Sequence, residues 1–556
     1  MSVTIEGIFH REGTGQSHVE VDNTKFAITD RAVILGRALD GDQVRWHSTG
    51  GDWTLTVLQR PARTIVGVLN LRSTRLYGRN KKGHNIYGMV PLEPRWPHFQ
   101  VASSLRDRSC NVYIQIEFKE WIIGHDLPVG TIIELIGRTD DPMAEERALL
   151  LKNRLCTKIP KWSIGDLSAN ATPRPHFANA ITIDPAGSKD FDDAFSLEGD
   201  SVFVHIADVD SLIAKGVPMS DIREWGNLET IYGDTVYPML PRHYSEELLS
   251  LNTQGRKNTI TIELRAEGTT LVPQRAFLST IEVERNWTYE EAQQDLSSSP
   301  YRDIFRLTGE TDTHKVIERL MVICNAYVGT VLNRHGMTFL RCAELRAADM
   351  PVTGPWCYGP GYYSTVAAPH AAISVPDFPL YTHFTSPIRR AADLIVARLL
   401  KGVLAGSTQP AYSPAELENF VNLINDCHRR TKRFYRERAL GQLIRTLGPG
   451  RHQMYGTILG YEPPHRASIY LEYGVSHAGM GEGIMFKGSL FHRDLSECIS
   501  PNVVGNRLQL TGALEDSIPL YERLELYVLV RPEELTLDRK LIIIAPITQV
   551  PTDPTA

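Results

Sequence analysis

The sequence has few cysteines and no paired cysteine motif. Its seven cysteines are scattered through 556 residues, and none forms a CxxC pair. This spacing argues against a disulfide framework and against a cysteine-based zinc site.

Long apolar runs, low-complexity tracts and a leader peptide are missing as well. No run approaches the about 18 apolar residues that a membrane-spanning helix needs. The first residues, MSVTIEGIFHREG, show no basic segment followed by an apolar one. We therefore expect an intracellular, cytoplasmic protein without a membrane partner, and a monomer.

The chain also lacks a strong excess of one charge. Its 59 Lys and Arg against 65 Asp and Glu give a net charge of −6, which by itself argues weakly against a polyanionic partner. The basic residues are clustered, however: residues 72–82 hold five and no acid, and residues 429–451 hold eight and one acid, Glu437. Most charge runs are solvated faces, but two runs that flank a carboxylate-rich centre favour a track for a phosphate backbone.

Periodicity divides the chain into strand-rich ends and a mixed centre, which predicts a multidomain α+β protein. Short β-type runs bounded by turn residues dominate both ends, and long helical spacing is confined to the centre. The predicted segments are a barrel at 1–62, a second barrel at 63–140, a connector at 141–178, a mixed domain at 179–448, a third barrel at 449–548 and a disordered tail at 549–556.

Three long helices are expected in the mixed domain. Helical apolar spacing covers residues 314–336 and 414–448. Between them, Ser386 is a plausible N-cap with Pro387 in the first turn, and this helix would close on Gly402 or Gly406.

The most unusual stretch is ITIDPAGSKDFDDAF, residues 181–195, because it gathers four aspartates directly after an apolar run. Two carboxylates 4 Å apart repel by roughly 4 kcal/mol at an effective dielectric of 20, so a buried group must bind protons or cations. Hard oxygen ligands favour Mg²⁺, with Mn²⁺ as an alternative. An acidic surface loop is the commoner explanation, but apolar runs on both sides favour burial. The four are Asp184, Asp190, Asp192 and Asp193.

A second polar motif, TSPIRRAAD, covers residues 385–393. If Ser386 caps a helix, Arg389 lies in its first turn, where free N–H groups and the helix dipole attract an anion. A guanidinium there would form a phosphate clamp, and Asp393, four residues on, could hold it in place. The alternative is a helix start whose arginines merely extend to solvent.

Metal-binding carboxylates and an arginine clamp are suited to phosphodiester hydrolysis. Barrels of the OB type with basic grooves suit single-stranded nucleic acid. The residues alone therefore predict a metal-dependent nuclease that acts on single strands.

The segments TIDPAGSKDFDDA, HIADV, YPMLP, THFTSPIRR and AADL resemble the RNB catalytic domain of the ribonuclease II and ribonuclease R family, and the domain order matches as well. The resemblance implies two N-terminal cold-shock barrels, a central RNB domain and a C-terminal S1 barrel. It also implies an exoribonuclease that hydrolyses single-stranded RNA from the 3′ end, with Mg²⁺, to nucleoside 5′-monophosphates.

The resemblance assigns roles to individual residues. The four aspartates would hold metal and the attacking water, with Asp192 the least replaceable, and Arg389 would contact the scissile phosphate. For a single tyrosine or glutamate, core packing or a surface charge is the commoner role. The residues implied in substrate binding are Tyr232, Tyr289, Glu318 and Arg390.

The chain departs from the family pattern in several places. The insert that usually carries an RNA-wedging aromatic is shortened to about residues 295–312. The histidine and glutamate of the HE.P element become Ala343 and Glu344, and the expected glutamate of the last helix aligns with Tyr435, with Glu437 two residues away. Weaker processivity, a different stopping length and altered substrates all remain open.

Three functions compete on this basis. The first is a 3′→5′ exoribonuclease. The second is an RNA-binding protein of the same fold that no longer cleaves, and the third is a metal-dependent phosphatase or DNA nuclease. The presence of all four aspartates and of Arg389 favours the first.

Overall fold

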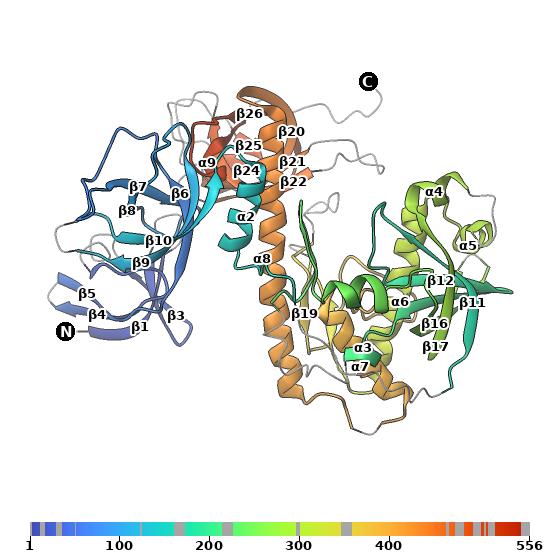
Figure 1. Ribbon diagram of the computed structural model, residues 1–556. Helices are drawn as coiled ribbons and strands as arrows, with labels where there is room; N and C mark the ends of the chain where they lie inside the picture. Colours follow the sequence, from blue (N-terminus) through green and yellow to red (C-terminus); the bar gives the residue numbers. More distant parts are fainter. Residues whose placement is uncertain are drawn as a thin grey trace. The chain divides into compact units, whose positions relative to one another are not determined.

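The computed structural model divides the chain into two compact units, which are considered separately (Figure 1). Unit 1 comprises Met1–Arg154 and Lys432–Ala556, and unit 2 comprises Leu155–Thr431. The structure describes residues 3–11, 17–28, 36–49, 52–122, 125–160, 173–213, 226–268, 270–295, 301–345, 358–407, 409–462, 466–472, 483–492, 502–504, 507–509 and 517–545. The predicted tail at 549–556 lies outside the described residues.

Unit 1 begins with a five-stranded antiparallel sheet in the order β3-β2-β1-β4-β5. Asp22 and Asn23 both have positive φ and form the two-residue turn between β2 and β3, as the right-handed twist of a hairpin favours. Phe9, Val19 and Val44 are fully buried in its core. The strands are β1 (Val3–Arg11), β2 (Ser17–Val21), β3 (Thr24–Ile28), β4 (Gln43–Thr49) and β5 (Asp52–Gln59).

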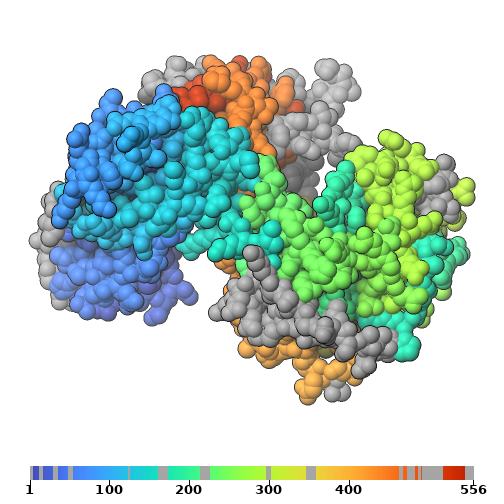
Figure 2. Space-filling model, viewed as in Figure 1, coloured from blue at the N-terminus to red at the C-terminus, as the bar shows by residue number. Residues whose placement is uncertain are grey.

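A closed barrel follows in unit 1, in the order β10-β8-β7-β6-β9. In the space-filling view this barrel lies beside the first sheet (Figure 2). Its interior is filled by Leu69, Met89, Phe99 and other apolar side chains. The strands are β6 (Thr64–Leu69), β7 (Asn85–Pro91), β8 (Phe99–Ser103), β9 (Val112–Glu120) and β10 (Val129–Arg138).

The C-terminal part of unit 1 is a second closed barrel, in the order β20-β21-β22-β27-β26. A three-stranded sheet and a short helix accompany it. The barrel strands are β20 (Gly450–Glu462), β21 (Arg466–Glu472), β22 (Gly483–His492), β26 (Arg523–Val530) and β27 (Leu541–Ala545). The other elements are β23 (Asn502–Val504), β24 (Arg507–Gln509), β25 (Ser517–Pro519) and α9 (Leu537–Lys540).

Charged pairs tie helix α2 (Pro142–Lys152) to the part of α8 (Pro414–Leu447) that belongs to unit 1. Arg438 Nε donates to Glu146 (2.6 Å). Glu437 accepts from Lys152 Nζ (2.7 Å) and from Asn153 Nδ2 (3.0 Å). Glu437, the lone acid of the second basic run, is therefore engaged within unit 1.

Unit 2 is built on a third closed barrel, in the order β11-β12-β13-β16-β17. Strand β13 is buried along its whole length, as its continuous apolar run indicates. The strands are β11 (His176–Asp184), β12 (Asp193–Glu198), β13 (Ser201–Ala207), β16 (Arg256–Glu267) and β17 (Thr270–Thr288). Two short hairpins join β14 (Ile231–Tyr232) to β15 (Val236–Tyr237) and β18 (Leu340–Cys342) to β19 (Tyr362–Ser364).

Helices cover this barrel and extend its core. The long ones are α6 (Thr313–Arg334), α7 (Ala391–Leu404) and α8, of which residues up to Thr431 belong to unit 2. Among the described helices, α6 alone is long and apolar enough to cross a membrane, but 61% of its most apolar window is buried, as in a core helix. The others are α3 (Asp210–Ile213), the π-helix η2 (His243–Leu248), α4 (Tyr289–Gln294) and α5 (Tyr301–Thr308).

The predicted fold class is confirmed: β-barrels precede and follow, in sequence, a mixed domain of strands and helices.

Candidate active site

The four aspartates lie at the junction of β11 and β12. Asp184 ends β11, Asp193 begins β12, and Asp190 and Asp192 lie in the loop between them. The carbonyl of Asp192 accepts a hydrogen bond from Ala207 N at the end of β13 (2.9 Å). Strand pairing therefore brings the four carboxylates to one end of the unit 2 barrel.

Asp192 is the best-held of the four, and only 3% of it is exposed. Its Oδ1 accepts from the backbone N–H of Ile388 (2.7 Å), and its Oδ2 accepts from Arg389 Nε (3.2 Å). Arg389 Nη2 in turn donates to Ser386 Oγ (3.0 Å). The two motifs that the sequence analysis singled out therefore meet at this pair, although nearly 200 residues separate them in the chain.

The predicted helix start at Ser386 is wrong, because α7 begins only at Ala391. Residues 387–389 form a turn in which Arg390 N donates to the carbonyl of Ser386 (3.0 Å), and only Arg390 is extended. This turn pairs with another segment: Thr230 N donates to the carbonyl of Arg389 (2.9 Å), and Ala391 N donates to that of Leu228 (2.9 Å). Arg389 therefore precedes the helix instead of lying in its first turn. Hydrogen bonds to Leu228 and Thr230, which are distant in sequence, therefore determine where the helix begins, although Ser386 is a favourable N-cap residue.

Asp393 does not hold Arg389, contrary to the prediction. It is fully buried and accepts from Ser386 N (2.8 Å) and from Arg390 Nη2 (2.8 Å). The Arg390 side chain is 22% exposed and turned toward Asp393. Arg389 is held by Asp192, as described above.

Burial raises the pKa of Asp184, Asp192 and Asp193. Burial raises the pKa of Asp192 to about 8, although the Arg389 charge opposes it. Burial, with the nearby charge of Asp190, also raises the pKa of Asp184, to about 7. Burial and the charges of Asp184 and Asp192 raise the pKa of Asp193 well above its usual range. Full ionisation of the group at neutral pH therefore requires a compensating positive charge.

The donor chemistry of this group fits a divalent cation. All four side chains offer hard carboxylate oxygens, and Asp184 Oδ2 is buried with no hydrogen-bond partner among the described residues. The described side chains nonetheless contain no ready-made cluster of three or more His, Cys, Asp or Glu in metal-holding geometry. The oxygens would have to converge further around a cation.

The three other predicted contact residues are placed differently. Tyr232 donates to Asp190 Oδ2 (3.0 Å), so it adjoins the aspartates directly. Tyr289 starts α4, one residue after the β17 position that pairs with Asp184. Glu318 lies exposed on α6 and makes no ion pair or hydrogen bond with the described residues.

The sequence analysis missed a polar network beside the arginine segment. Arg341 Nη2 donates to His428 Nε2 (2.9 Å), so the ring proton lies on Nδ1, which faces Glu229 Oε2 at 3.5 Å. Glu229 forms a β-bridge with Arg390. Burial opposes ionisation of Glu229, but His428 and the Arg390 charge outweigh it, and the pKa of Glu229 is lowered. Three distant segments supply these residues, so no local pattern could reveal them.

The two basic runs differ in how much of their charge is already neutralised. In residues 429–451, Arg430 pairs with Asp426 (3.0 Å), and Arg438 and Arg445 pair with acids of α2. In residues 72–82 the cations are exposed and form no ion pair with described residues. The basic residues at 72–82 are therefore less neutralised by neighbouring acids than those at 429–451.

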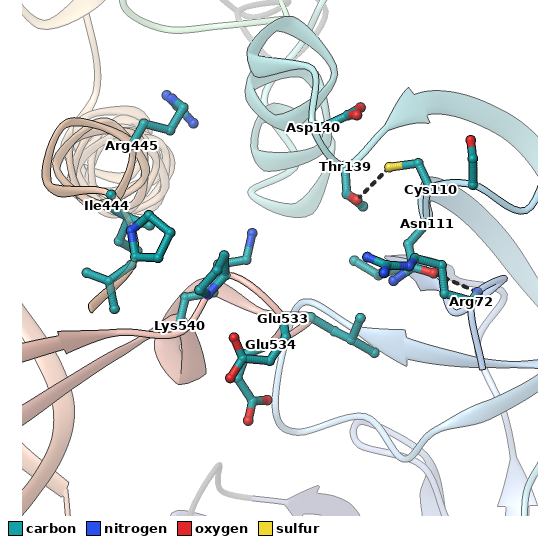
Figure 3. A pocket seen from close by; sticks show the side chains of 17 residues that line it. Arg72, Cys110, Asn111, Thr139, Asp140, Ile444, Arg445, Glu533, Glu534 and Lys540 are labelled. Carbon is teal, nitrogen blue, oxygen red and sulfur yellow. Dashed lines mark hydrogen bonds between the residues drawn. The ribbon is translucent and has the colours of Figure 1, made fainter. Parts of the chain in front are cut away.

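A pocket of about 440 Å³ in unit 1 is not a uniformly basic groove (Figure 3). Side chains from the barrel β6–β10, from the end of α8 and from the C-terminal barrel line it, and Cys110 contacts Thr139 Oγ1 at 3.4 Å on one wall. Three basic and three acidic side chains line it, so their charges balance, and none of the four aspartates is among its lining residues. The charged lining residues are Arg72, Arg445, Lys540, Asp140, Glu533 and Glu534.

Comparison with protein families identifies the class to which the central domain belongs. The RNB domain matches residues 177–303 and 356–406, and the Dis3-like cold-shock domain 2 matches residues 86–154. The chain is thus a relative of the RNB-domain exoribonucleases, as its motifs suggested, and the barrel β6–β10 matches an OB-type cold-shock domain over most of its strands.

Individual relatives are similar to the chain over much of its length. Ribonuclease R of Thermotoga maritima is 24% identical over 529 residues, which cover 74% of this chain and 72% of the relative. Ribonuclease R of Helicobacter pylori is 24% identical, with 61% of this chain and 66% of the relative covered.

Solved structures share the fold at low sequence identity. Mycoplasma genitalium RNase R in complex with ribose-methylated single-stranded RNA superposes with a TM-score of 0.74 at 18% identity, covering 98% of this chain and all of the other. Yeast Ssd1, described as a pseudonuclease, superposes with a TM-score of 0.55 at 16% identity, covering 87% of this chain and 79% of its own.

Proposed function

We propose that the protein is a Mg²⁺-dependent exoribonuclease that hydrolyses single-stranded RNA from its 3′ end and releases nucleoside 5′-monophosphates. The observation that carries this proposal is the contact of Asp192 with Arg389 inside an RNB domain, where two distant motifs meet. The curated relatives named Ribonuclease R support the activity, and the RNA bound to the M. genitalium protein supports the substrate class.

Asp184, Asp190 and Asp193 would hold the cation together with Asp192, which keeps free lone pairs because a carboxylate offers about four acceptor sites. A bound Mg²⁺ would lower the pKa of a water and stabilise the leaving oxygen. Mn²⁺ would be accepted by the same hard oxygen donors.

Arg389 is placed to contact the phosphate that is attacked. Its Nε and Nη2 bind Asp192 and Ser386, while Nη1 has no hydrogen bond to a described residue and 43% of the side chain is exposed. A guanidinium fixed at two nitrogens and open at the third would stabilise the charge that develops on a phosphate oxygen. Asp192 thus serves two tasks: it orients Arg389 and it contributes to the cation site.

The second candidate is an RNA-binding protein of the same fold that no longer cleaves. Its support is the likeness to Ssd1 in fold and the departures at Ala343 and Tyr435. The intact set of four aspartates with Arg389 favours the enzyme.

One assay separates these functions. The protein is incubated with Mg²⁺ and three 5′-labelled substrates: a single-stranded RNA, the DNA of the same sequence, and the RNA blocked at its 3′ end. We expect a ladder from the open RNA alone. Tight binding without cleavage would support the second candidate, and equal digestion of DNA would contradict RNA specificity.

Asp192→Asn is the matched variant for this assay. We expect it to abolish cleavage and to change RNA affinity by less than about threefold, because phosphate contacts along the strand dominate binding. A variant that still cuts at the wild-type rate would refute the assigned role of Asp192.

A further inference from the structure

Two aromatic rings form a flat stack beside the aspartates. The rings of Tyr289 and His314 lie 4.0 Å apart between centroids, with an interplanar angle of 8°. His314 is the second residue of α6 and Tyr289 the first of α4, so the stack joins the starts of two helices.

The stack is held by hydrogen bonds on both sides. A capping box fixes the start of α4: Glu291 N donates to Thr288 Oγ1 (3.1 Å), and Thr288 N donates to Glu291 Oε2 (2.9 Å). Gln293 Oε1 of α4 accepts from both N and Oγ1 of Thr313, the first residue of α6 (2.8 Å each). The two rings are therefore positioned before any ligand arrives.

The stack lies next to the carboxylates. In the parallel pairing of β11 with β17, Thr288 is the partner of Asp184, so Tyr289 follows directly. Burial raises the pKa of the Tyr289 hydroxyl, and the charges of Asp193 and Asp184 raise it further.

The outer face of the stack is open. The His314 side chain is 67% exposed, which is incompatible with coverage of both ring faces. Asp312 approaches His314 Nδ1 at 3.9 Å, and Glu318 is exposed one helical turn further along α6. Negative charge beside the open face disfavours a phosphate there, whereas an uncharged base is tolerated.

We propose that the Tyr289–His314 stack is a platform for the base of one of the two nucleotides that flank the last linkage of a bound RNA, with His314 providing the contact surface. Bases stack on aromatic rings without strong sequence preference, at about 1–3 kcal/mol per base. The inference rests on the proposed function and adds a specific base-binding residue to it. His314 lies just beyond the shortened insert of residues 295–312.

The test measures binding in a protein that does not cut. Asp192→Asn is combined with His314→Ala, His314→Phe or, as a matched control at the other end of α6, His335→Ala. Each protein is titrated with RNA carrying 2-aminopurine at the last, the penultimate or the sixth nucleotide from the 3′ end.

We expect quenching at the last or the penultimate position in the parent protein, and its loss in His314→Ala with an affinity drop on the order of fivefold. His314→Phe and His335→Ala should behave like the parent. An RNA that is abasic at the quenched position should bind the parent and His314→Ala equally.

Equal fluorescence and equal affinity of the parent and His314→Ala at both positions would overturn the inference. So would an unchanged affinity difference with the abasic RNA, because the effect would then not arise from the base. Neither result bears on whether the enzyme cleaves, which the Asp192 single variant decides separately.

Discussion

At the scale of single residues, the site is a group of carboxylates kept where ionisation is unfavourable. Burial raises the pKa of Asp184 to about 7 and that of Asp192 to about 8. Ionisation of these buried carboxyls lowers the stability of the cation-free protein. Such a loss of stability is expected at a functional site.

We predict that cation-free protein loses stability as the pH rises from about 5 to 8. A carboxyl whose pKa is raised by folding binds more protons in the folded state than in the unfolded state over this range, so its stabilisation declines with rising pH. Asp184→Asn should raise the melting temperature at pH 8 in EDTA more than at pH 5.

Thermal melts at the two pH values measure this effect. Asp200→Asn is the control, because Asp200 is exposed and follows β12 in the same barrel. It should change the melting temperature little at either pH. If Asp184→Asn lowered the melting temperature at pH 8, the assignment of an unfavourable charge to Asp184 would be wrong.

Site residues that lie close together in the sequence could be predicted from it. The four aspartates and Arg389 stand out by type and spacing alone. The hydrogen bond of Ile388 N to Asp192 and the Glu229–His428–Arg341 network could not be foreseen, because each joins segments distant in sequence.

At the scale of elements, the long helices with regular apolar spacing could be predicted, whereas the first residue of a helix that follows a polar segment could not. Helix α6 spans Thr313–Arg334 and α8 spans Pro414–Leu447, close to the predicted 314–336 and 414–448. The start of α7 was misplaced by four residues, because the backbone of Arg389 and Ala391 hydrogen-bonds to Thr230 and Leu228 before the helix begins.

We predict that Glu437→Ala lowers the free energy of unfolding of unit 1 by about 1–3 kcal/mol, the cost of leaving buried polar partners unpaired. Lys152 is 12% exposed and Asn153 is 2% exposed, and both donate to this carboxylate. Denaturant unfolding measures the loss. Gln442→Ala, exposed on the part of α8 that belongs to unit 1, controls for helix propensity, and equal effects of the two variants would contradict a structural role for Glu437.

At the scale of the whole molecule, the two units have separate cores, although α8 contributes to both. The four candidate cation ligands all belong to unit 2. A ligand stabilises only the part of the molecule that binds it.

Scanning calorimetry should therefore resolve two transitions, of which Mg²⁺ raises only one. The raised transition should be the one that Asp184→Asn also shifts, which identifies unit 2. An equal shift of both transitions would show that the units unfold together.

The proposed hydrolysis depends most directly on a cation bound among the aspartates. Anomalous diffraction from a crystal soaked in Mn²⁺ with a short RNA tests it. We predict a peak at about 2.0–2.2 Å from carboxylate oxygens of this group, with Arg389 on the phosphate of the last linkage. A well-ordered crystal with no peak there, and with the carboxylates turned to solvent, would contradict the account.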